Sequence, residues 1–174
     1  NMNTNLKEYL AMVPSNWKSK GRIYGEACEF WTAAQLRCVQ CDATLKKLDA
    51  NAKSIDHKCT SCNEQYQVKA SQKGFSRRDG SIKFIGAEYS TTVASMNGGN
   101  PQWNLLLVEY SEANEEVNKV LVINKENTSS DNVVARKPLG PHCRRAGWQG
   151  CYFEFSAADA VEIKLNNPTI PAVQ

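Results

Sequence analysis

The chain has 174 residues, of which 41% are hydrophobic and 22% are charged, so it is long enough to form one domain with a substantial core. No apolar run approaches the roughly 18 residues that a membrane span needs, and the N-terminal stretch lacks the basic and then apolar pattern of a signal peptide. The composition therefore excludes an integral membrane protein and predicts a globular, cytoplasmic one.

Two helices are predicted before the first cysteine pair. Residues 4–13 place apolar side chains at helical spacing, and Thr4 is expected to cap the helix. Residues 21–35 form a second helical stretch. Both lie in the first fifth of the chain.

Three further elements are predicted after the cysteine-rich region. Residues 86–96, "GAEYSTTVASM", are expected to form a helix packed on a sheet. Leu105–Tyr110 has the length of a buried strand, and residues 117–124, "VNKVLVIN", form a second strand after a polar turn. Central strands with flanking helices indicate an α/β or α+β fold.

The net charge of +3 is unevenly distributed. The segments 69–83 and 136–145 hold nine basic residues and one acid, a net +8, which leaves −5 for the rest of the chain. Two basic segments on an otherwise acidic chain are typical of a nucleic-acid-binding protein. Charge alone also allows chance clustering on a solvated surface.

Four of the seven cysteines form two Cys-x-x-Cys pairs, Cys38/Cys41 and Cys59/Cys62, with 17 residues between them. This spacing is typical of a structural zinc site, because each pair aims two thiolates at one tetrahedral ion. Redox disulfides and coincidence are the alternatives. The remaining cysteines are expected to be small buried hydrophobes: Cys28, Cys143 and Cys151.

The segment after the second pair, "QYQVKAS", alternates so that Gln67 and Lys69 share one strand face. A hairpin turn at the cysteine pair would place Asp56 roughly opposite Gln65, with Gln67 as its diagonal neighbour. Two oxygen ligands and an ammonium at one spot suit magnesium-dependent phosphodiester hydrolysis. The pattern alone is weak, because an ordinary exposed hairpin face would look the same.

The stretch "ARKPLGPHCRRAGWQGC", residues 135–151, sharpens this interpretation. Together with "QYQVKASQKGF", "NPQWNLLLVEY" and the two cysteine pairs, in this order, it resembles the Dam-replacing, DpnI-like family of methyl-directed restriction endonucleases over about residues 31–155. Family members cut both strands of duplex DNA at GATC sites that carry N6-methyladenine, using magnesium. The resemblance thus implies a type II site-specific deoxyribonuclease.

The resemblance also implies a fold and roles for particular residues. The expected fold is an α/β PD-(D/E)xK nuclease core, a central mixed sheet flanked by helices, with an inserted four-cysteine zinc site. Asp56, Gln67 and Lys69 would be the catalytic residues, with Asp56, Gln67 and the Val68 carbonyl holding magnesium. The structural zinc ligands would be the four paired cysteines, Cys38, Cys41, Cys59 and Cys62.

The chain departs from the family pattern at two places. The family motif has Glu where this chain has Gln67, which removes one negative charge from the magnesium site. DpnI-type enzymes continue into a C-terminal winged helix, whereas residues 1–174 are expected to form a single nuclease domain without one. Two alternatives stay open: a catalytically impaired module that binds methylated DNA, and a nuclease of the same fold that acts on other modified or structured DNA.

The basic segments supply candidate DNA contacts. The Arg-rich stretch is expected to be a rigid loop because its prolines and glycines prevent a regular helix. Its cations can hold phosphates or read guanine, and Trp148 can pack on a methyl group or a base, or simply anchor the loop. The predicted contacts to double-stranded DNA, made as a monomer or weak dimer, are Lys73, Arg77, Arg78, Arg136, Lys137, Arg144, Arg145 and Trp148.

Overall fold

A computed structural model describes residues 2–49, 55–96 and 98–165 of the chain. These residues form a mixed α/β fold with few helices, as the sequence predicted at this level. They divide into two compact units. One unit comprises Asn1–Gly74, Trp103–Val122 and Val161–Gln174, and the other comprises Phe75–Gln102 and Ile123–Ala160.

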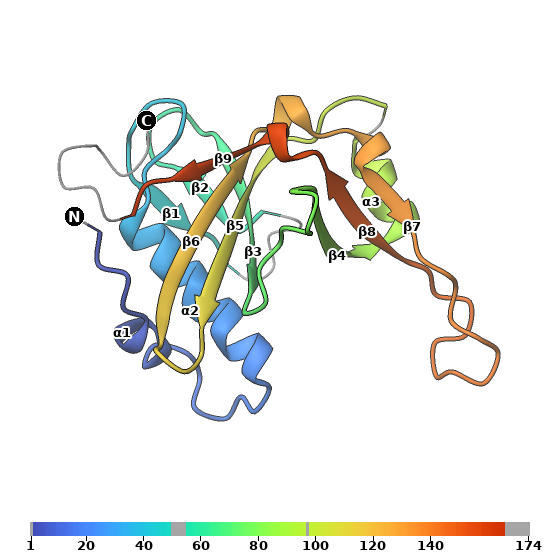
Figure 1. The fold of residues 1–174 in the computed structure, drawn as a ribbon, viewed down its shortest axis with the longest axis horizontal. Coiled ribbons are helices and arrows are strands. Elements are labelled where there is room, and N and C mark those ends of the chain that lie inside the picture. Colours follow the sequence, from blue (N-terminus) through green and yellow to red (C-terminus); the bar gives the residue numbers. More distant parts are fainter. Residues whose placement is uncertain (1, 50–54, 97, 166–174) are drawn as a thin grey trace. The chain divides into compact units, whose positions relative to one another are not determined.

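The first unit contains a mixed sheet with the strand order β1-β2-β3-β5-β6-β9. β1 pairs with β2 and β2 with β3 in antiparallel fashion, whereas β3 and β5 are parallel (Figure 1). The strand bounds are Leu45–Lys47 for β1, His57–Cys59 for β2, Gln65–Ser71 for β3, Trp103–Ser111 for β5, Glu116–Ile123 for β6 and Ala160–Ile163 for β9.

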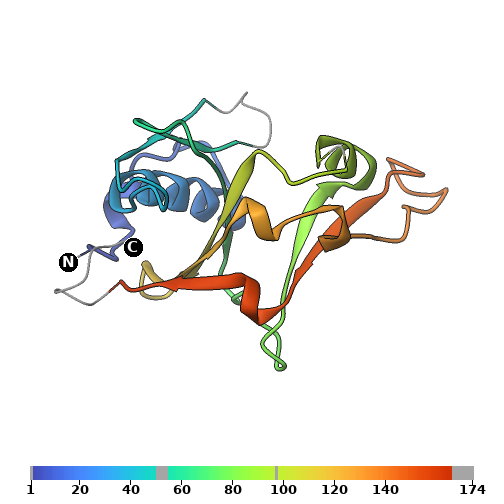
Figure 2. The same ribbon diagram turned by 90° about the horizontal axis from the view of Figure 1, so that it is seen from above.

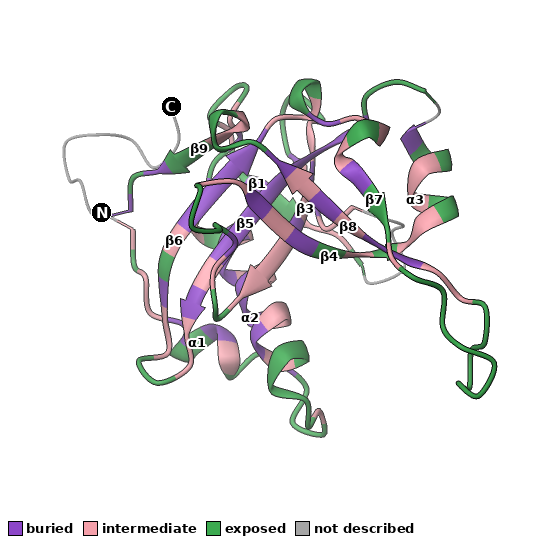
Figure 3. Cartoon of the chain, turned by 45° about the vertical axis from the view of Figure 1, so that its right-hand side comes forward, coloured by how far each residue is buried: buried purple, intermediate pink, exposed green. Residues whose placement is uncertain are grey.

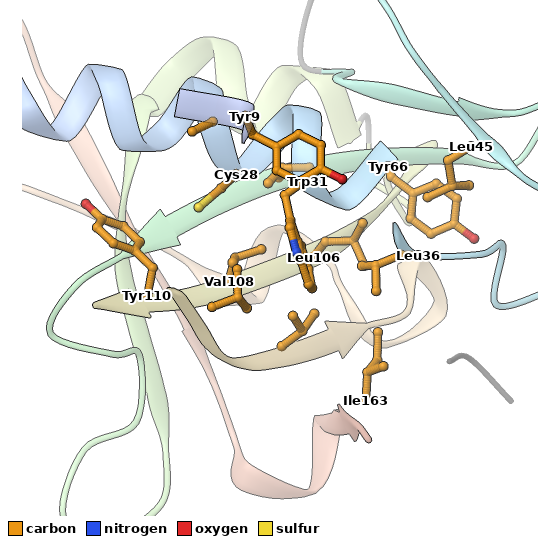
Figure 4. Close-up of a cluster of buried hydrophobic side chains, with 14 of the residues drawn as sticks. Tyr9, Cys28, Trp31, Leu36, Leu45, Tyr66, Leu106, Val108, Tyr110 and Ile163 are labelled. Carbon is orange, nitrogen blue, oxygen red and sulfur yellow. The ribbon is translucent and has the colours of Figure 1, made fainter. Parts of the chain in front are cut away.

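The long helix α2 (Lys20–Gln35) confirms the helix predicted over residues 21–35. Ser19 caps it by accepting a hydrogen bond from the Arg22 N–H (3.4 Å). Its buried side chains recur at helical spacing and pack against β3 and β5 (Figure 4). The central members of this core are Tyr24, Ala27, Cys28, Trp31, Tyr66, Val68, Leu106 and Val108.

The first predicted helix is shorter than expected. Only α1 (Lys7–Leu10) is helical, and Thr4 does not cap it. The Thr4 carbonyl accepts a hydrogen bond from the Val117 N–H (2.8 Å), and Asn5 forms an isolated bridge with Glu116. Pairing with the start of β6 therefore replaces the first helical turn, and the Asn5 side chain accepts from the Lys7 N–H instead (2.8 Å).

The predicted strands at 105–110 and 117–124 are confirmed as β5 and β6. All but two residues of β5 are buried, as expected for a strand covered on both faces. Among the described residues, none of the helices has the length and apolar character needed to cross a lipid bilayer.

The second unit is built on a three-stranded antiparallel sheet that the sequence did not predict. Its order is β4-β8-β7, with β4 at Ile82–Glu88, β8 at Gly150–Phe155 and β7 at Val133–Ala135 (Figure 2). Helix α3 (Tyr89–Met96) begins three residues later than predicted, because residues 86–88 belong to β4. Stacked Phe84, Phe153 and Phe155 fill one face of the sheet.

Three short 3-10 turns complete the second unit and its border. They span Lys125–Asn127, Ser130–Asn132 and Ala157–Asp159. The Asn132 side chain donates to the Glu154 carbonyl (2.8 Å), which ties the second turn to β8.

Candidate metal centres and nucleic-acid surface

The four paired cysteines form one cluster, as predicted. Their sulfur atoms all lie within 4.8 Å of one another, with 3.5 Å between Cys38 and Cys62 and 3.4 Å between Cys41 and Cys59. Each pair is followed by a residue in the left-handed region, Asp42 (φ 64°) or Asn63 (φ 63°). The two turns therefore have the same shape and direct four thiol groups to one point, where they can hold a metal ion such as zinc.

The surroundings of the cluster favour the thiolate form of Cys59 but not that of Cys62. A backbone hydrogen bond at Glu64 lowers the Cys62 pKa, but burial and the neighbouring sulfur atoms raise it to about 12. The Tyr66 hydroxyl donates to Cys38 Sγ (3.1 Å), and the N–H groups of Ser61 and Cys62 donate to Cys59 Sγ (3.4 Å each). Burial opposes ionisation of Cys59, but these backbone hydrogen bonds outweigh it and lower its pKa to about 7. A metal ion held by four sulfur ligands would have no open coordination position, which is the pattern of structural rather than catalytic zinc sites.

Asp56 lies directly before β2 and departs from the predicted register. His57 pairs with Tyr66 and Lys58 with Gln65, so it is Lys58, not Asp56, that lies opposite Gln65. The turn is displaced toward the C-terminus because Cys59 N–H bonds to the Glu64 carbonyl (2.8 Å) around the left-handed Asn63. The result brings Asp56 closer to Gln67 than the sequence predicted.

The pairing of β2 with β3 ends at Asp56, where the Asp56 side chain contacts the β3 backbone. The Asp56 N–H donates to the Tyr66 carbonyl (2.8 Å), and Asp56 Oδ2 accepts from the Val68 N–H (2.7 Å). The carboxylate thus replaces a backbone acceptor at the point where the two strands diverge. Its charge is held beside the segment 66–68 of β3.

Gln67 and Lys69 lie on the face of β3 opposite the buried Tyr66 and Val68. The Gln67 Oε1 atom is buried and has no hydrogen-bond partner among the described residues, and the same holds for Gln65 Oε1. A buried acceptor of this kind requires a donor or a cation. Within the described residues, Lys69 forms no ion pair.

Glu29 of α2 is a half-buried acid near Asp56 that the sequence interpretation did not single out. The Lys47 Nζ atom of β1 lies 3.8 Å from its carboxylate, and the Glu29 backbone carbonyl lies 3.0 Å from the Thr32 hydroxyl. Burial raises the Glu29 pKa to about 8, and the charges of Asp56 and Glu26 act in the same direction. A glutamate on a half-exposed helix looks like a solvated residue in the sequence, and no signal there distinguishes it.

His57 and Thr32 connect α2 to β2 beneath these carboxyl groups. Both side chains are fully buried, with 2.6 Å between Thr32 Oγ1 and His57 Nε2. Burial lowers the His57 pKa, which favours the neutral ring. The Nδ1–H group then donates to the Asp56 carbonyl (2.7 Å), and the Thr32 hydroxyl lies between Nε2 and the Glu29 carbonyl, 3.0 Å from the latter.

The Arg-rich stretch forms a loop between β7 and β8, and its composition predicted a loop but not the hairpin pairing at its base. The pairing continues beyond the strands through Arg136 N–H to the Gly150 carbonyl and Leu139 N–H to the Trp148 carbonyl, both 2.9 Å. Gly147 (φ 81°) makes the return turn. Residues 137–147 are all exposed (Figure 3), which leaves Lys137, Arg144 and Arg145 accessible to a large anion.

Trp148 packs at the base of this loop. It lies over Gly150, where an added Cβ would come within 3.0 Å of the indole ring. The Arg145 guanidinium lies 4.4 Å from the Trp148 ring centroid, and Arg136 lies 5.3 Å from that of Tyr152. The loop therefore presents cations supported by aromatic rings, an arrangement that suits both phosphates and bases.

The remaining predicted contacts are divided between the two units. Lys73 is exposed after β3 in the first unit, whereas Arg77 and Arg78 are exposed in the second. Arg77 is 3.3 Å from Glu154, which Lys83 also approaches at 3.4 Å. Arg77 is thus partly neutralised within its own unit.

The described residues thus form an α/β protein with a four-cysteine cluster that could hold a metal ion, oxygen donors on adjacent strands and an exposed loop rich in arginine. A model of the DpnI, Dam-replacing family matches residues 2–166, nearly the whole chain. The chain therefore belongs to the Dam-replacing family. This membership implies a function of the methyl-directed restriction endonuclease type, and hence a DNA substrate.

Proposed function

We propose that the chain is a magnesium-dependent endonuclease of the PD-(D/E)xK type that cleaves duplex DNA at adenine-methylated GATC sites. Asp56, Gln67 and Lys69 form its catalytic centre, and zinc occupies the four-cysteine cluster. The observation that carries this proposal is the contact of Asp56 Oδ2 with the Val68 N–H, because it brings the aspartate to the strand that bears Gln67 and Lys69.

The oxygen donors at this point suit a hard divalent cation. Asp56 contributes a carboxylate, and the buried Gln67 Oε1 is an acceptor without a hydrogen-bond partner among the described residues. The N–H and C=O groups of one strand residue point to the same neighbour, so the Val68 carbonyl is directed to the side of Asp56. Bound magnesium would polarise the scissile phosphate and lower the pKa of an attacking water.

Lys69 follows Gln67 by two residues and therefore shares its strand face. Since no ion pair engages it within the described residues, its ammonium is available to orient the attacking water and to offset the developing negative charge. Lys47, by contrast, is held by Glu26 (2.9 Å) and Glu29, and is not a candidate for this role.

The Arg-rich loop is proposed to bind the DNA. Arg136, Lys137, Arg144 and Arg145 offer phosphate contacts, and an arginine of this loop is suited to the guanine of GATC. Trp148, half-buried between Arg145 and Gly150, retains an aromatic surface for the methylated base. Lys73, Arg77 and Arg78 are further phosphate contacts, with Arg77 weakened by Glu154.

The test is digestion of one plasmid prepared from Dam-positive and Dam-negative hosts, with and without magnesium. The proposal predicts cutting of the methylated plasmid alone, and only with the metal. Binding of methylated DNA without any cutting, in magnesium or manganese, would contradict it and indicate a reader whose chemistry is disabled at Gln67. Cutting of unmethylated or structured DNA would assign the chain to a different substrate.

A further inference from the structure

We infer that the Tyr66 hydroxyl is an outer-sphere partner of the metal in the four-cysteine cluster. It donates a hydrogen bond to the Cys38 sulfur and thereby raises the affinity of the cluster for zinc. This inference rests on the proposed function only where zinc is assigned to the cluster. Tyr66 is a positioning residue, since it contacts a metal ligand and not the metal.

Tyr66 reaches the cluster from β3. Its side chain is fully buried in the core of the first unit (Figure 4), and its hydroxyl group donates to Cys38 Sγ at 3.1 Å. The same oxygen accepts a hydrogen bond from the Val39 N–H at 3.0 Å. One hydroxyl thus engages two successive residues of the first cysteine turn. Because the oxygen already accepts from Val39, its single proton is directed to the sulfur.

The two buried sulfur atoms of the cluster, those of Cys38 and Cys59, obtain their hydrogen-bond donors in different ways. Cys59 Sγ accepts from the N–H groups of Ser61 and Cys62 in its own turn, at 3.4 Å each. Cys38 Sγ accepts instead from the side chain of Tyr66, which lies outside the first turn. The hydroxyl therefore takes the role that backbone groups fill in the second turn.

A hydrogen bond to a coordinated thiolate stabilises charge that the metal neutralises only in part. Four thiolates bring more negative charge than one divalent ion offsets, and burial removes the water that would otherwise solvate Cys38. A hydrogen bond to a charged acceptor is stronger than one between neutral groups. Loss of an outer-sphere partner typically lowers metal affinity by about 10–100-fold.

The same residue joins the cluster to the β2–β3 hairpin. Tyr66 pairs with His57, and its carbonyl group accepts from the Asp56 N–H at 2.8 Å. Its side chain therefore holds the first cysteine turn, while its backbone holds the start of β2. The four sulfur ligands still come from the two turns, so a chain without this hydroxyl should bind the metal, but more weakly.

The test is Tyr66→Phe, which removes the hydroxyl and keeps the ring in the core. The zinc dissociation constant, measured by competition with a chromogenic chelator, is expected to rise about tenfold or more. With Co²⁺ in place of zinc, the d–d bands of a tetrahedral site should persist and show that the cluster is assembled. The thiolate-to-cobalt charge-transfer band should move to lower energy, because a thiolate without a donor releases electron density more readily. A change in packing alone would leave this band in place.

Two variants serve as matched controls. Tyr9→Phe removes another buried tyrosine hydroxyl, whose bond is to the Gln35 side chain (2.9 Å) rather than to a sulfur. Thr60→Val removes a hydrogen bond between the two cysteine turns, from Thr60 Oγ1 to the Thr44 carbonyl (3.0 Å). Each should leave the charge-transfer band in place and change the zinc dissociation constant less than about threefold.

The outcomes separate this inference from the zinc assignment. If Tyr66→Phe binds zinc as tightly as the native protein and its charge-transfer band is unchanged, the inference is overturned and the zinc site stands. If Thr60→Val moves the band as far as Tyr66→Phe does, contact between the turns and not the hydroxyl is responsible, which also overturns it. If the native protein takes up neither zinc nor cobalt, the zinc assignment and the inference both fail.

Discussion

The two candidate metal sites lie at opposite ends of the same short strand. Cys59 is the last residue of β2, and Asp56 directly precedes its first residue, His57. At the cysteine end, all four thiol groups come from two short turns, each with one left-handed residue, Asp42 or Asn63. At the aspartate end, the participating groups come from the start of β2 and the middle of β3, and the Thr32–His57 contact holds α2 beside them.

The cysteine site is thus formed by two local turns, whereas the aspartate site depends on tertiary contacts. The cysteine turns need only each other and a metal ion, whereas the aspartate end needs the buried Thr32–His57 link and the β3 backbone. Because β2 and β3 connect the two ends, the cysteine cluster fixes the hairpin on which Asp56 and Gln67 are placed. Loss of the metal there should therefore damage both sites, and damage to the aspartate end should not affect the cysteines.

The strongest test of this asymmetry is Cys59→Ser. Structural zinc contributes about 10–16 kcal/mol of binding free energy to the folding of small zinc-finger peptides. Within a larger core, we expect this variant to lose more than about 4 kcal/mol of unfolding free energy. It should bind no zinc, measured by elemental analysis, and should also lose Mn²⁺ binding at Asp56. Cys143→Ser, which changes an exposed cysteine in the other unit, is the control and should match the native protein. Intact Mn²⁺ binding in zinc-free protein would show that the two ends are independent.

A smaller effect is expected from Thr32→Val, which tests the aspartate end alone. The change preserves side-chain shape but removes the hydroxyl that contacts His57 Nε2 and the Glu29 carbonyl, and a buried polar group left without its partner costs about 1–3 kcal/mol. Urea unfolding should show this loss while one zinc per chain is retained. Loss of zinc from this variant would mean that α2 supports the cysteine cluster as well.

Substitutions in the Arg-rich loop should have the smallest effect on stability. They should affect DNA binding instead. Arg144→Ala and Arg145→Ala remove exposed cations, so the unfolding free energy should stay within about 0.5 kcal/mol. Each variant that loses a phosphate contact should reduce the slope of log K against log salt by about 1. Lys119→Ala, whose side chain pairs with Glu162, is the control and should leave the slope unchanged. Unchanged slopes for both arginine variants would remove the loop from the interface.

The same distinction explains what the sequence could predict. The cysteine cluster was predictable because its ligands depend on spacing alone, and α2 was predictable because Tyr24, Ala27, Cys28 and Trp31 repeat at helical spacing. The approach of Glu29 to Lys47 of β1 was not, because nothing in a helical pattern tells which carboxylate will meet a strand from another part of the chain. The register of Asp56 was wrong by two residues since the turn extends through the left-handed Asn63.

The elements around the Arg-rich loop were missed for a related reason. β7 has three residues, and only pairing with β8 identifies it as a strand. The start of β4 lies next to a basic turn, and its end was assigned to the following helix. α1 is shorter than predicted because Asn5 pairs with Glu116, and this long-range contact overrides the local helix propensity.

The central claim is that Asp56, Gln67 and Lys69 form one catalytic centre, and the most direct test is Lys69→Ala assayed on methylated GATC duplex with magnesium. The account predicts that the cleavage rate falls by roughly 10²–10⁴-fold. The affinity for the uncleaved duplex, measured in calcium, should stay within about threefold of that of the native protein, because one cation among several contributes little to binding. Cleavage by Lys69→Ala at the native rate would contradict the account and place the chemistry elsewhere in the molecule.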